Sequence, residues 1–209
     1  MNYTELKTNI EDICETSFTD AQLAMFTEQA EQTIYNTVQI PALRRNATSN
    51  FSSGNQYLAL PSDFLYAYSL AVTDSNGDYQ YLLNKDVNFI REAYPTSATG
   101  GLPKHYAFFD DDFFIVGPTP DSTYAVELHY GYYPESIVTA GTTWLGEEFD
   151  SALLNASLVQ AARFMKAEPD IVQNYDKMFA TALTLLKQLG DGKLREDAYR
   201  SGQYRMSVR

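Results

Sequence analysis

The sequence is poor in the residues that build disulfides and zinc sites. Among 209 residues it has one cysteine, Cys14, and two histidines, His105 and His129. A single cysteine excludes a disulfide within the chain. A structural zinc site normally needs four cysteine or histidine ligands, and these three residues lie far apart in sequence. We therefore expect no metal site.

Sequence motifs for catalysis and nucleotide binding are also missing. There is no Gly-x-Ser-x-Gly elbow, although a Ser-His-Asp triad assembled by the fold stays possible, and no glycine-rich phosphate loop. The adjacent carboxylates at Glu147–Glu148 and Asp110–Asp112 fall in expected loops, where solvated surface is their ordinary role. The segment Asp74–Asp78 resembles part of a calcium loop but lacks the distal glutamate. We expect a protein that is not an enzyme and that uses no cofactor.

Long apolar runs are absent as well. No stretch approaches the roughly 20 apolar residues that a membrane-spanning helix needs. The first residues, Met1–Glu5, have neither the basic start nor the apolar run of a secretory signal. The expectation is a protein without membrane contact that folds in a reducing cytosol.

The net charge of −12 is unevenly distributed. Residues 191–209 carry five basic and three acidic side chains, so the rest of the chain carries −14. An acidic body repels nucleic acid, which disfavours ordinary DNA or RNA binding. The basic C-terminal segment is better suited to an acidic groove on a partner protein.

Apolar residues at helical spacing predict two helices at each end of the chain. The first pair spans about residues 4–14 and 20–39, and Thr19 with Gln22 forms a capping box at the start of its second helix. Cys14 shares the apolar stripe of the first helix, so we expect it to be buried. Asp150 and Asp170 are expected to cap the last two helices, and Gly190 to close the final one.

The middle of the chain is rich in tyrosine and phenylalanine and reads as strands. Asn76-Gly77 and Asp110–Asp112 mark hairpins, and Asn84 is expected to cap a short helix. The strand at 64–72 is apolar enough for burial on both faces. A loop anchored by Trp144-Leu145 is expected over 134–146. The predicted strands are 44–51 pairing with 56–60, then 64–72, 79–83, 103–109, 113–116 and 124–132.

These elements together predict an α+β fold. Residues 1–43 and 148–190 form a four-helix body, with two helices from each end of the chain. An antiparallel β-rich domain, residues 44–147, is inserted into this body, and residues 191–209 form an extended C-terminal tail.

Several short segments, in this order, resemble one family of proteins. They are Leu60–Phe64, Pro103–Ala107, Phe114–Pro120, Leu128–Pro134 and the terminal helix pair. Together they look like the head-to-tail adaptor proteins of tailed phages, also called connector or head-completion proteins, particularly those of short-tailed phages. The resemblance covers nearly the whole chain, and its strength lies in the order of the segments.

The resemblance implies a structural virion protein of the phage neck, assembled in the host cytoplasm. Such adaptors form a ring below the portal, usually a dodecamer, and connect it to tail nozzle or tail-fibre proteins. Packaged DNA passes through the ring without specific binding.

The resemblance also implies that the C-terminal segment docks on the portal protein. Arginine and aromatic side chains dominate interface energetics, which directs attention to the anchors in this segment. The candidate docking residues are Lys193, Arg195, Tyr199, Arg200, Gln203, Tyr204 and Arg205. A frayed C-terminus is the plain alternative.

Two other functions stay open from the residues alone. The tyrosine-rich β-domain could serve a carbohydrate-binding or tail-fibre-associated module through ring stacking on sugars. An enzyme such as a hydrolase would need a triad or a carboxylate pair that no motif in this sequence indicates.

Overall fold

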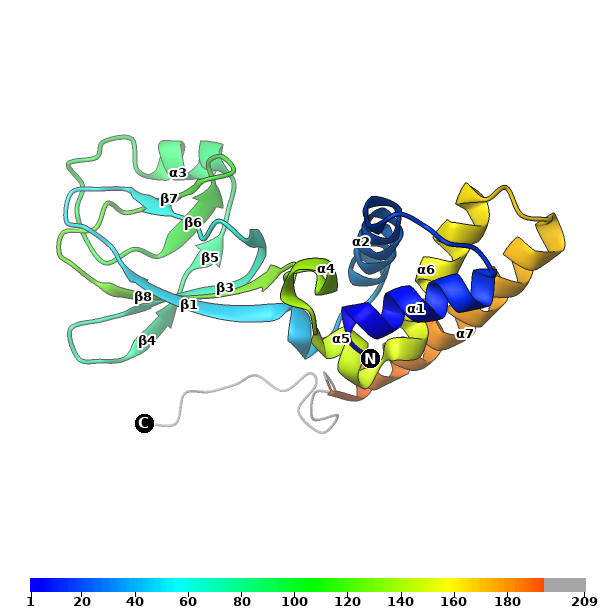
Figure 1. Ribbon diagram of the computed structural model, residues 1–209. Coiled ribbons are helices and arrows are strands. Elements are labelled where there is room, and N and C mark those ends of the chain that lie inside the picture. The colour runs from blue at the N-terminus through cyan, green and yellow to red at the C-terminus, as the bar shows by residue number, and fades with distance from the viewer. Residues whose placement is uncertain (194–209) are drawn as a thin grey trace. The chain divides into compact units, whose positions relative to one another are not determined.

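The computed structural model describes residues 1–193, with side chains through Asp191 (Figure 1). It is an α+β fold with two compact units. One unit consists of residues 1–43 together with the chain from Pro134 onward, and the other consists of residues 44–133. The β-rich unit is therefore inserted between two parts of a helical unit. Residues 134–147, predicted as part of the β-rich domain, lie in the helical unit.

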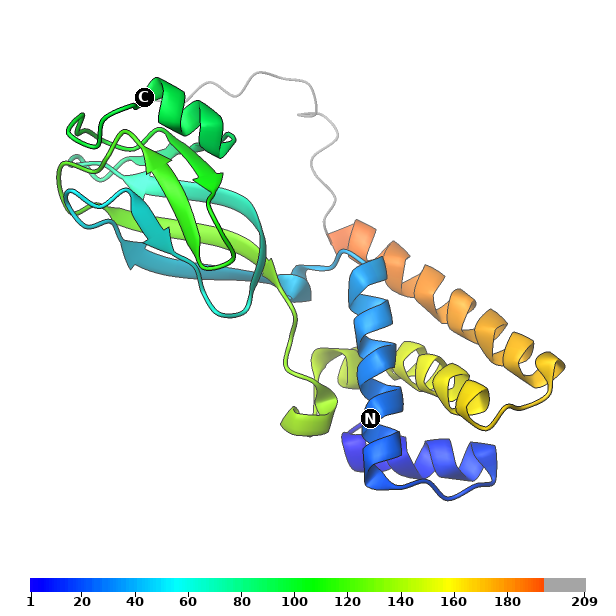
Figure 2. The same cartoon turned by 90° about the horizontal axis from the view of Figure 1, so that it is seen from above.

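Four long helices form the body of the helical unit, two from each end of the chain, as predicted. The helix α6 packs against the other three (Figure 2). Its small residues, such as Ala152, Ala156 and Ala161, are buried. Leu6 and Ile10 of α1, Phe26 and Ile34 of α2 and Leu186 of α7 contribute to the same core. The four helices are α1 (Tyr3–Cys14), α2 (Asp20–Thr37), α6 (Asp150–Phe164) and α7 (Pro169–Lys193).

The helix ends follow the expected capping rules in part. The capping box of Thr19 and Gln22 is confirmed at α2, and Asn2 with Glu5 makes another at α1. The predicted cap at Asp150 is wrong, because Phe149 occupies the cap position and makes no side-chain cap bond. Asp150 lies inside the first turn, where a negative charge still complements the helix dipole.

The last helix also differs from its prediction at both ends. It begins at Pro169, so Asp170 lies in its first turn and does not precede it. Gly190 does not close α7, which continues to Lys193. A Cβ atom at Gly190 would lie 2.6 Å from the carbonyl oxygen of Gln39, so the glycine lets two backbones approach closely.

Two short helices replace the predicted loop over residues 134–146. They are α4 (Ile137–Ala140), capped by Ser136, and α5 (Trp144–Glu148), capped by Thr143. The predicted anchor is confirmed, because Leu145 is buried and Trp144 packs, partly buried, against the helical core. The prediction that Cys14 is buried is wrong: it is the last residue of α1 and packs only partly buried at the edge of the helical core.

The β-rich unit contains two four-stranded sheets that share one core. The strand orders are β1-β8-β3-β4 and β2-β7-β6-β5, and all pairs are antiparallel except β5 with β6. Leu70, Val126 and Leu128 from the first sheet meet Phe114 and Val116 from the second. The short helix α3 (Val87–Ala93) covers a smaller cluster around Ile90. The strands are β1 (Arg44–Asn50), β2 (Tyr57–Ala59), β3 (Phe64–Thr73), β4 (Tyr79–Tyr81), β5 (Leu83–Asn84), β6 (His105–Phe108), β7 (Phe113–Gly117) and β8 (Ala125–Tyr132).

Both predicted tight hairpins are confirmed. The chain turns between β3 and β4 at Asp74–Asp78, and between β6 and β7 at Asp110–Asp112. The predicted pairing of residues 44–51 with 56–60 is wrong, because β1 pairs with β8 and β2 pairs with β7. The turn at residues 52–55 thus carries the chain from one sheet to the other.

Three smaller predictions in this unit are corrected. The first half of β3 is exposed at Leu65 and Tyr66, and complete burial is confined to Leu70–Val72. The predicted strand 79–83 is divided between the two sheets at Leu82. Asp86, whose carboxylate accepts a 2.8 Å hydrogen bond from the Phe89 N–H, caps α3 in place of Asn84.

Candidate functional site

The predicted portal-docking residues begin where α7 ends. Lys193 is the last residue of that helix. The others, Arg195, Tyr199, Arg200, Gln203, Tyr204 and Arg205, lie outside the described residues. Residues 191–193, predicted as part of an extended tail, are helical. The docking assignment therefore stays a prediction.

The two histidines occupy separate sheets and do not form a common site. In β6, the Nδ1 atom of His105 lies 2.9 Å from the Tyr94 hydroxyl. Burial and the positive charges of Lys85 and Lys104 lower the pKa of His105. In β8, the ring of His129 packs on Tyr68 with 5.2 Å between centroids. Within the described residues, no three acidic, histidine or cysteine side chains group in a way that could hold a metal ion.

The acidic groups noted in the sequence stabilise local turns. The Asp74 carboxylate accepts hydrogen bonds from the backbone N–H groups of Asn76 and Asp78. The Asp110 carboxylate accepts similar bonds from Asp112 and Phe113. Both carboxylates hold the tips of hairpins, as the turn interpretation predicts. Glu147 and Glu148 lie in the short helix α5 and not in a loop.

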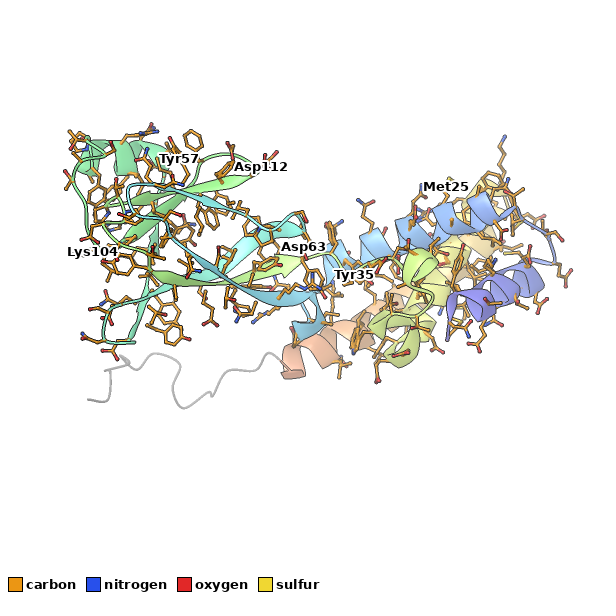
Figure 3. All side chains as sticks on the ribbon, turned by 60° about the vertical axis from the view of Figure 1, so that its left-hand side comes forward. Met25, Tyr35, Tyr57, Asp63, Lys104 and Asp112 are labelled. Carbon is orange, nitrogen blue, oxygen red and sulfur yellow. The ribbon has the colours of Figure 1, made fainter. Side chains whose placement is uncertain are left out.

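A charged junction at Asp63 ties three segments of the β-rich unit together (Figure 3). Its carboxylate accepts 2.5 and 2.9 Å hydrogen bonds from the Arg45 guanidinium in β1 and the Tyr130 hydroxyl in β8. The same guanidinium lies over the Tyr132 ring, 4.6 Å from its centroid. Burial works to raise the pKa of Asp63, but the hydrogen bonds from Tyr130 and Arg45, a backbone hydrogen bond and the positive charge of Arg45 together hold that pKa below its usual value.

Only part of this junction could be recognised from the sequence. The segment Leu60–Phe64 is one of those that carry the family resemblance, but its aspartate had no assigned role. Its partners lie 18 and 67 residues away, so spacing along the chain could not reveal them. The one indication of a charged contact in the sequence was the adjacent pair Arg44-Arg45 in a strongly acidic chain.

Aromatic and arginine side chains collect on the outer face of the sheet β1-β8-β3-β4. The predicted alternation along β8 is confirmed, since Val126, Leu128 and Tyr130 are buried while Glu127 and His129 are more exposed. The Arg44 guanidinium lies 4.2 Å from the centroid of the Tyr68 ring, and Tyr66 contacts Tyr68 edge to face. Tyr79 and Tyr81 of β4 are 59 and 69% exposed on this sheet.

A second exposed aromatic surface surrounds the β6–β7 hairpin, near Tyr57 and Asp112 (Figure 3). Phe108, Phe109 and Phe113 are each about two-fifths exposed, although phenylalanine is normally buried. The Tyr57 ring contacts Phe109 with 5.1 Å between centroids, and the Tyr57 hydroxyl accepts a hydrogen bond from Arg91. Exposed aromatic groups beside an arginine are typical of protein-binding surfaces.

Comparison with known proteins agrees with a binding protein of this kind. The model of one family, described as SU10 adaptor protein, matches residues 1–206. No curated protein matches the chain. Among the described residues, none of the helices has the length and apolar character to cross a membrane. The match includes both units and most of the C-terminal segment, and the chain therefore belongs to the SU10 adaptor protein family of phage head-to-tail adaptors.

Proposed function

We propose that this adaptor forms a closed ring below the portal and joins the portal to the phage tail. The observation that carries the proposal is the family match over almost the entire chain. Because a ring is built from identical copies, one surface of each copy must contact a different surface of the next. A dodecamer would match the usual symmetry of the portal.

The C-terminal segment is the proposed contact with the portal. It follows α7 directly, and its anchors would be Lys193, Arg195, Tyr199, Arg200, Gln203, Tyr204 and Arg205. The segment is basic, so it would be attracted to an acidic groove on the portal protein.

The β-rich unit is the proposed contact with tail nozzle or tail-fibre proteins. Its support is the pair of exposed aromatic surfaces described above, since large aromatic groups on a soluble surface usually mark a partner site. A docked partner would remove Phe108, Phe109 and Phe113 from water.

The acidic body also suits a DNA channel. A ring with few positive charges offers little binding to phosphates, so packaged DNA would slide through without specific contacts. Neutralising carboxylates that line the channel is expected to slow DNA ejection, and unchanged ejection would count against this part of the proposal.

The experiment that tests the ring is native mass measurement of the full chain alone and mixed with its portal ring. We expect a discrete complex with one copy per portal subunit. A variant that lacks residues 194–209 should keep its helical content and fail to attach. Truncation after Lys193 is preferable to an earlier one, because Gly190 lies against Gln39 inside the helical unit.

A matched pair of full-length variants distinguishes the effect of the anchor side chains from the effect of shortening the C-terminal segment. Replacing Tyr199, Arg200, Tyr204 and Arg205 with serine should abolish attachment. Replacing Ser201, Gly202 and Ser207 with alanine should not. A mass that never changes with the portal would overturn the proposed ring, and attachment that survives truncation would overturn only the docking segment.

A further inference from the structure

A groove crosses the outer face of the sheet β1-β8-β3-β4. Its volume is about 320 Å³, and it is lined by Asn46, Ser69, Ala71, Tyr79, Tyr81, Glu127 and His129. The register explains its shape, because the small side chain of Ala71 lies between Tyr81 on one neighbouring strand and Glu127 on the other. The rings of Tyr79 and Tyr81 thus form one wall of the groove, and the Glu127 carboxylate lies on the opposite side of Ala71.

The carboxylate of Glu127 is held in place by neutral donors. The Asn46 side-chain amide donates a 2.6 Å hydrogen bond to it. The Tyr79 hydroxyl donates another, which raises the pKa of Tyr79. None of the ion pairs between described residues includes Glu127. The hydrogen bonds therefore hold this half-buried carboxylate in one orientation. No positively charged side chain of residues 1–191 forms an ion pair with it.

The same unit already contains a completed version of this arrangement. At the junction described above, a tyrosine hydroxyl also donates to a carboxylate, that of Asp63. There the Arg45 guanidinium pairs with the carboxylate and stacks on a tyrosine ring. The groove has the corresponding carboxylate, hydroxyl and exposed tyrosine rings, but the described part of the chain supplies no arginine to it.

We infer that the groove receives the guanidinium of an arginine side chain presented by a partner protein. The planar guanidinium would stack on Tyr81 and donate hydrogen bonds to Glu127, a combination that lysine, with its compact ammonium group, cannot reproduce. Ser69 and His129 would contact the edge of the bound group. The inference rests on contacts within the β-rich unit and holds whatever the number of copies in the ring.

The inference is tested with N-acetyl-arginine amide as the probe and the full-length chain labelled with ¹³C in its tyrosine rings. Tyr79→Phe and Tyr81→Phe variants assign the two ring signals. We expect both signals to move in a saturable way with the arginine probe. Glu127→Gln should weaken binding at least about tenfold, as expected when a charge-assisted hydrogen bond is lost.

Two controls identify the source of any effect. The Asp111→Asn variant removes one negative charge at an exposed hairpin tip and should bind the probe as the unchanged protein does. N-acetyl-glutamine amide, which lacks the positive charge, should leave both ring signals in place. Circular dichroism of Glu127→Gln confirms that the fold is kept.

Three outcomes would overturn the inference. One is a ring signal that does not respond to the arginine probe, or responds equally in Glu127→Gln. Another is saturable binding of methyl glucoside but not of the arginine probe, which would assign the groove to saccharides. The third is a response seen only after residues 194–209 are removed, which would show that the chain's own C-terminal arginines occupy the groove.

Discussion

The carboxylate of Glu31 in α2 accepts a 2.9 Å hydrogen bond from the backbone N–H of Ile137, the first residue of α4. The Ser136 hydroxyl donates to the same carboxylate. Glu31 is only 3% exposed and Ile137 is fully buried, so a buried carboxylate accepts from a backbone N–H at a helix start that has no partner within the helix. It fixes the segment that returns from β8 to the helical unit.

Removing the Glu31 carboxylate should destabilise the helical unit. Glu31→Ala leaves the buried Ile137 N–H without its acceptor, and we expect a loss of about 2–3 kcal/mol in the free energy of unfolding. Glu31→Gln keeps one acceptor oxygen and should cost about half as much. Urea denaturation followed by circular dichroism measures both, and equal stability of the two variants would contradict the role of the hydrogen bond.

The pH dependence of this effect has a definite sign. Burial raises the pKa of Glu31 above its ordinary value of 4.5, with hydrogen bonds from Ser136 and Ile137 opposing it. The folded state therefore binds a proton more readily than the unfolded state, and stability rises as pH falls through this window. Relative to Glu31→Gln, the unchanged protein should gain stability between neutral pH and about 4.5. A constant difference across this range would show that Glu31 does not titrate there.

The Asp63 junction should respond to pH in the opposite direction. The pKa of Asp63 is lowered in the fold, so its contribution is present above the unfolded value of 3.8 and is lost as pH falls through the folded pKa. Tyr130→Phe removes one of its hydrogen bonds and should cost about 1 kcal/mol at neutral pH. The cost should shrink in strong acid. Thermal unfolding at neutral pH and in strong acid measures the cost of Tyr130→Phe under each condition. A cost that does not shrink in acid would mean that the variant acts through packing of the ring.

The aromatic cluster of the helical unit offers a direct test of the core. Phe26 is buried and contacts Phe18 and Phe164, with 5.3 Å between its ring centroid and each of theirs. Phe26→Ala should cost about 3–5 kcal/mol of unfolding free energy. Its neighbour Met25 is 38% exposed, so Met25→Ala should cost less than about 1 kcal/mol (Figure 3). Similar costs for the two would refute the assigned burial.

Gly117 should not tolerate a side chain. A Cβ atom there would lie 2.3 Å from the Tyr94 ring, whose hydroxyl is held by His105. Gly117→Ala should therefore destabilise the β-rich unit by about 1–3 kcal/mol. Gly101→Ala is the matched control, since its Cβ would meet only Pro118 at an ordinary distance of 3.4 Å. Recovery of stability in Gly117→Ala combined with Tyr94→Ala would identify the clash as the cause.

Local features of the fold were predictable from the sequence. The capping box at Thr19, the hairpin at Asn76-Gly77 and the alternation along β8 all depend on residues close together in the chain. The pairing of β1 with β8 could not be predicted from the sequence. It joins residues about 80 apart, and the turn at 52–55 offered β1 a nearer pairing partner. The short helices α4 and α5 are too short to show a helical repeat.

The sequence predicted the aromatic character of the binding surfaces but not their positions on the fold. The tyrosine content of the β-rich unit indicated a surface suited to ring stacking, and the structure shows which tyrosine rings are exposed. The groove at Glu127 combines side chains from four strands, and only the three-dimensional register brings Asn46, Tyr81 and Glu127 together.

The insertion of residues 44–133 determines the order in which the chain can fold during synthesis. The helices α1 and α2 bury Leu6, Ile10 and Phe26 in a core shared with α6, which the ribosome makes only after the whole β-rich unit. The β-rich unit is contiguous and can fold as soon as it emerges. The N-terminal helices must wait with their apolar faces uncovered, and they are therefore the part of the nascent chain that most needs a chaperone.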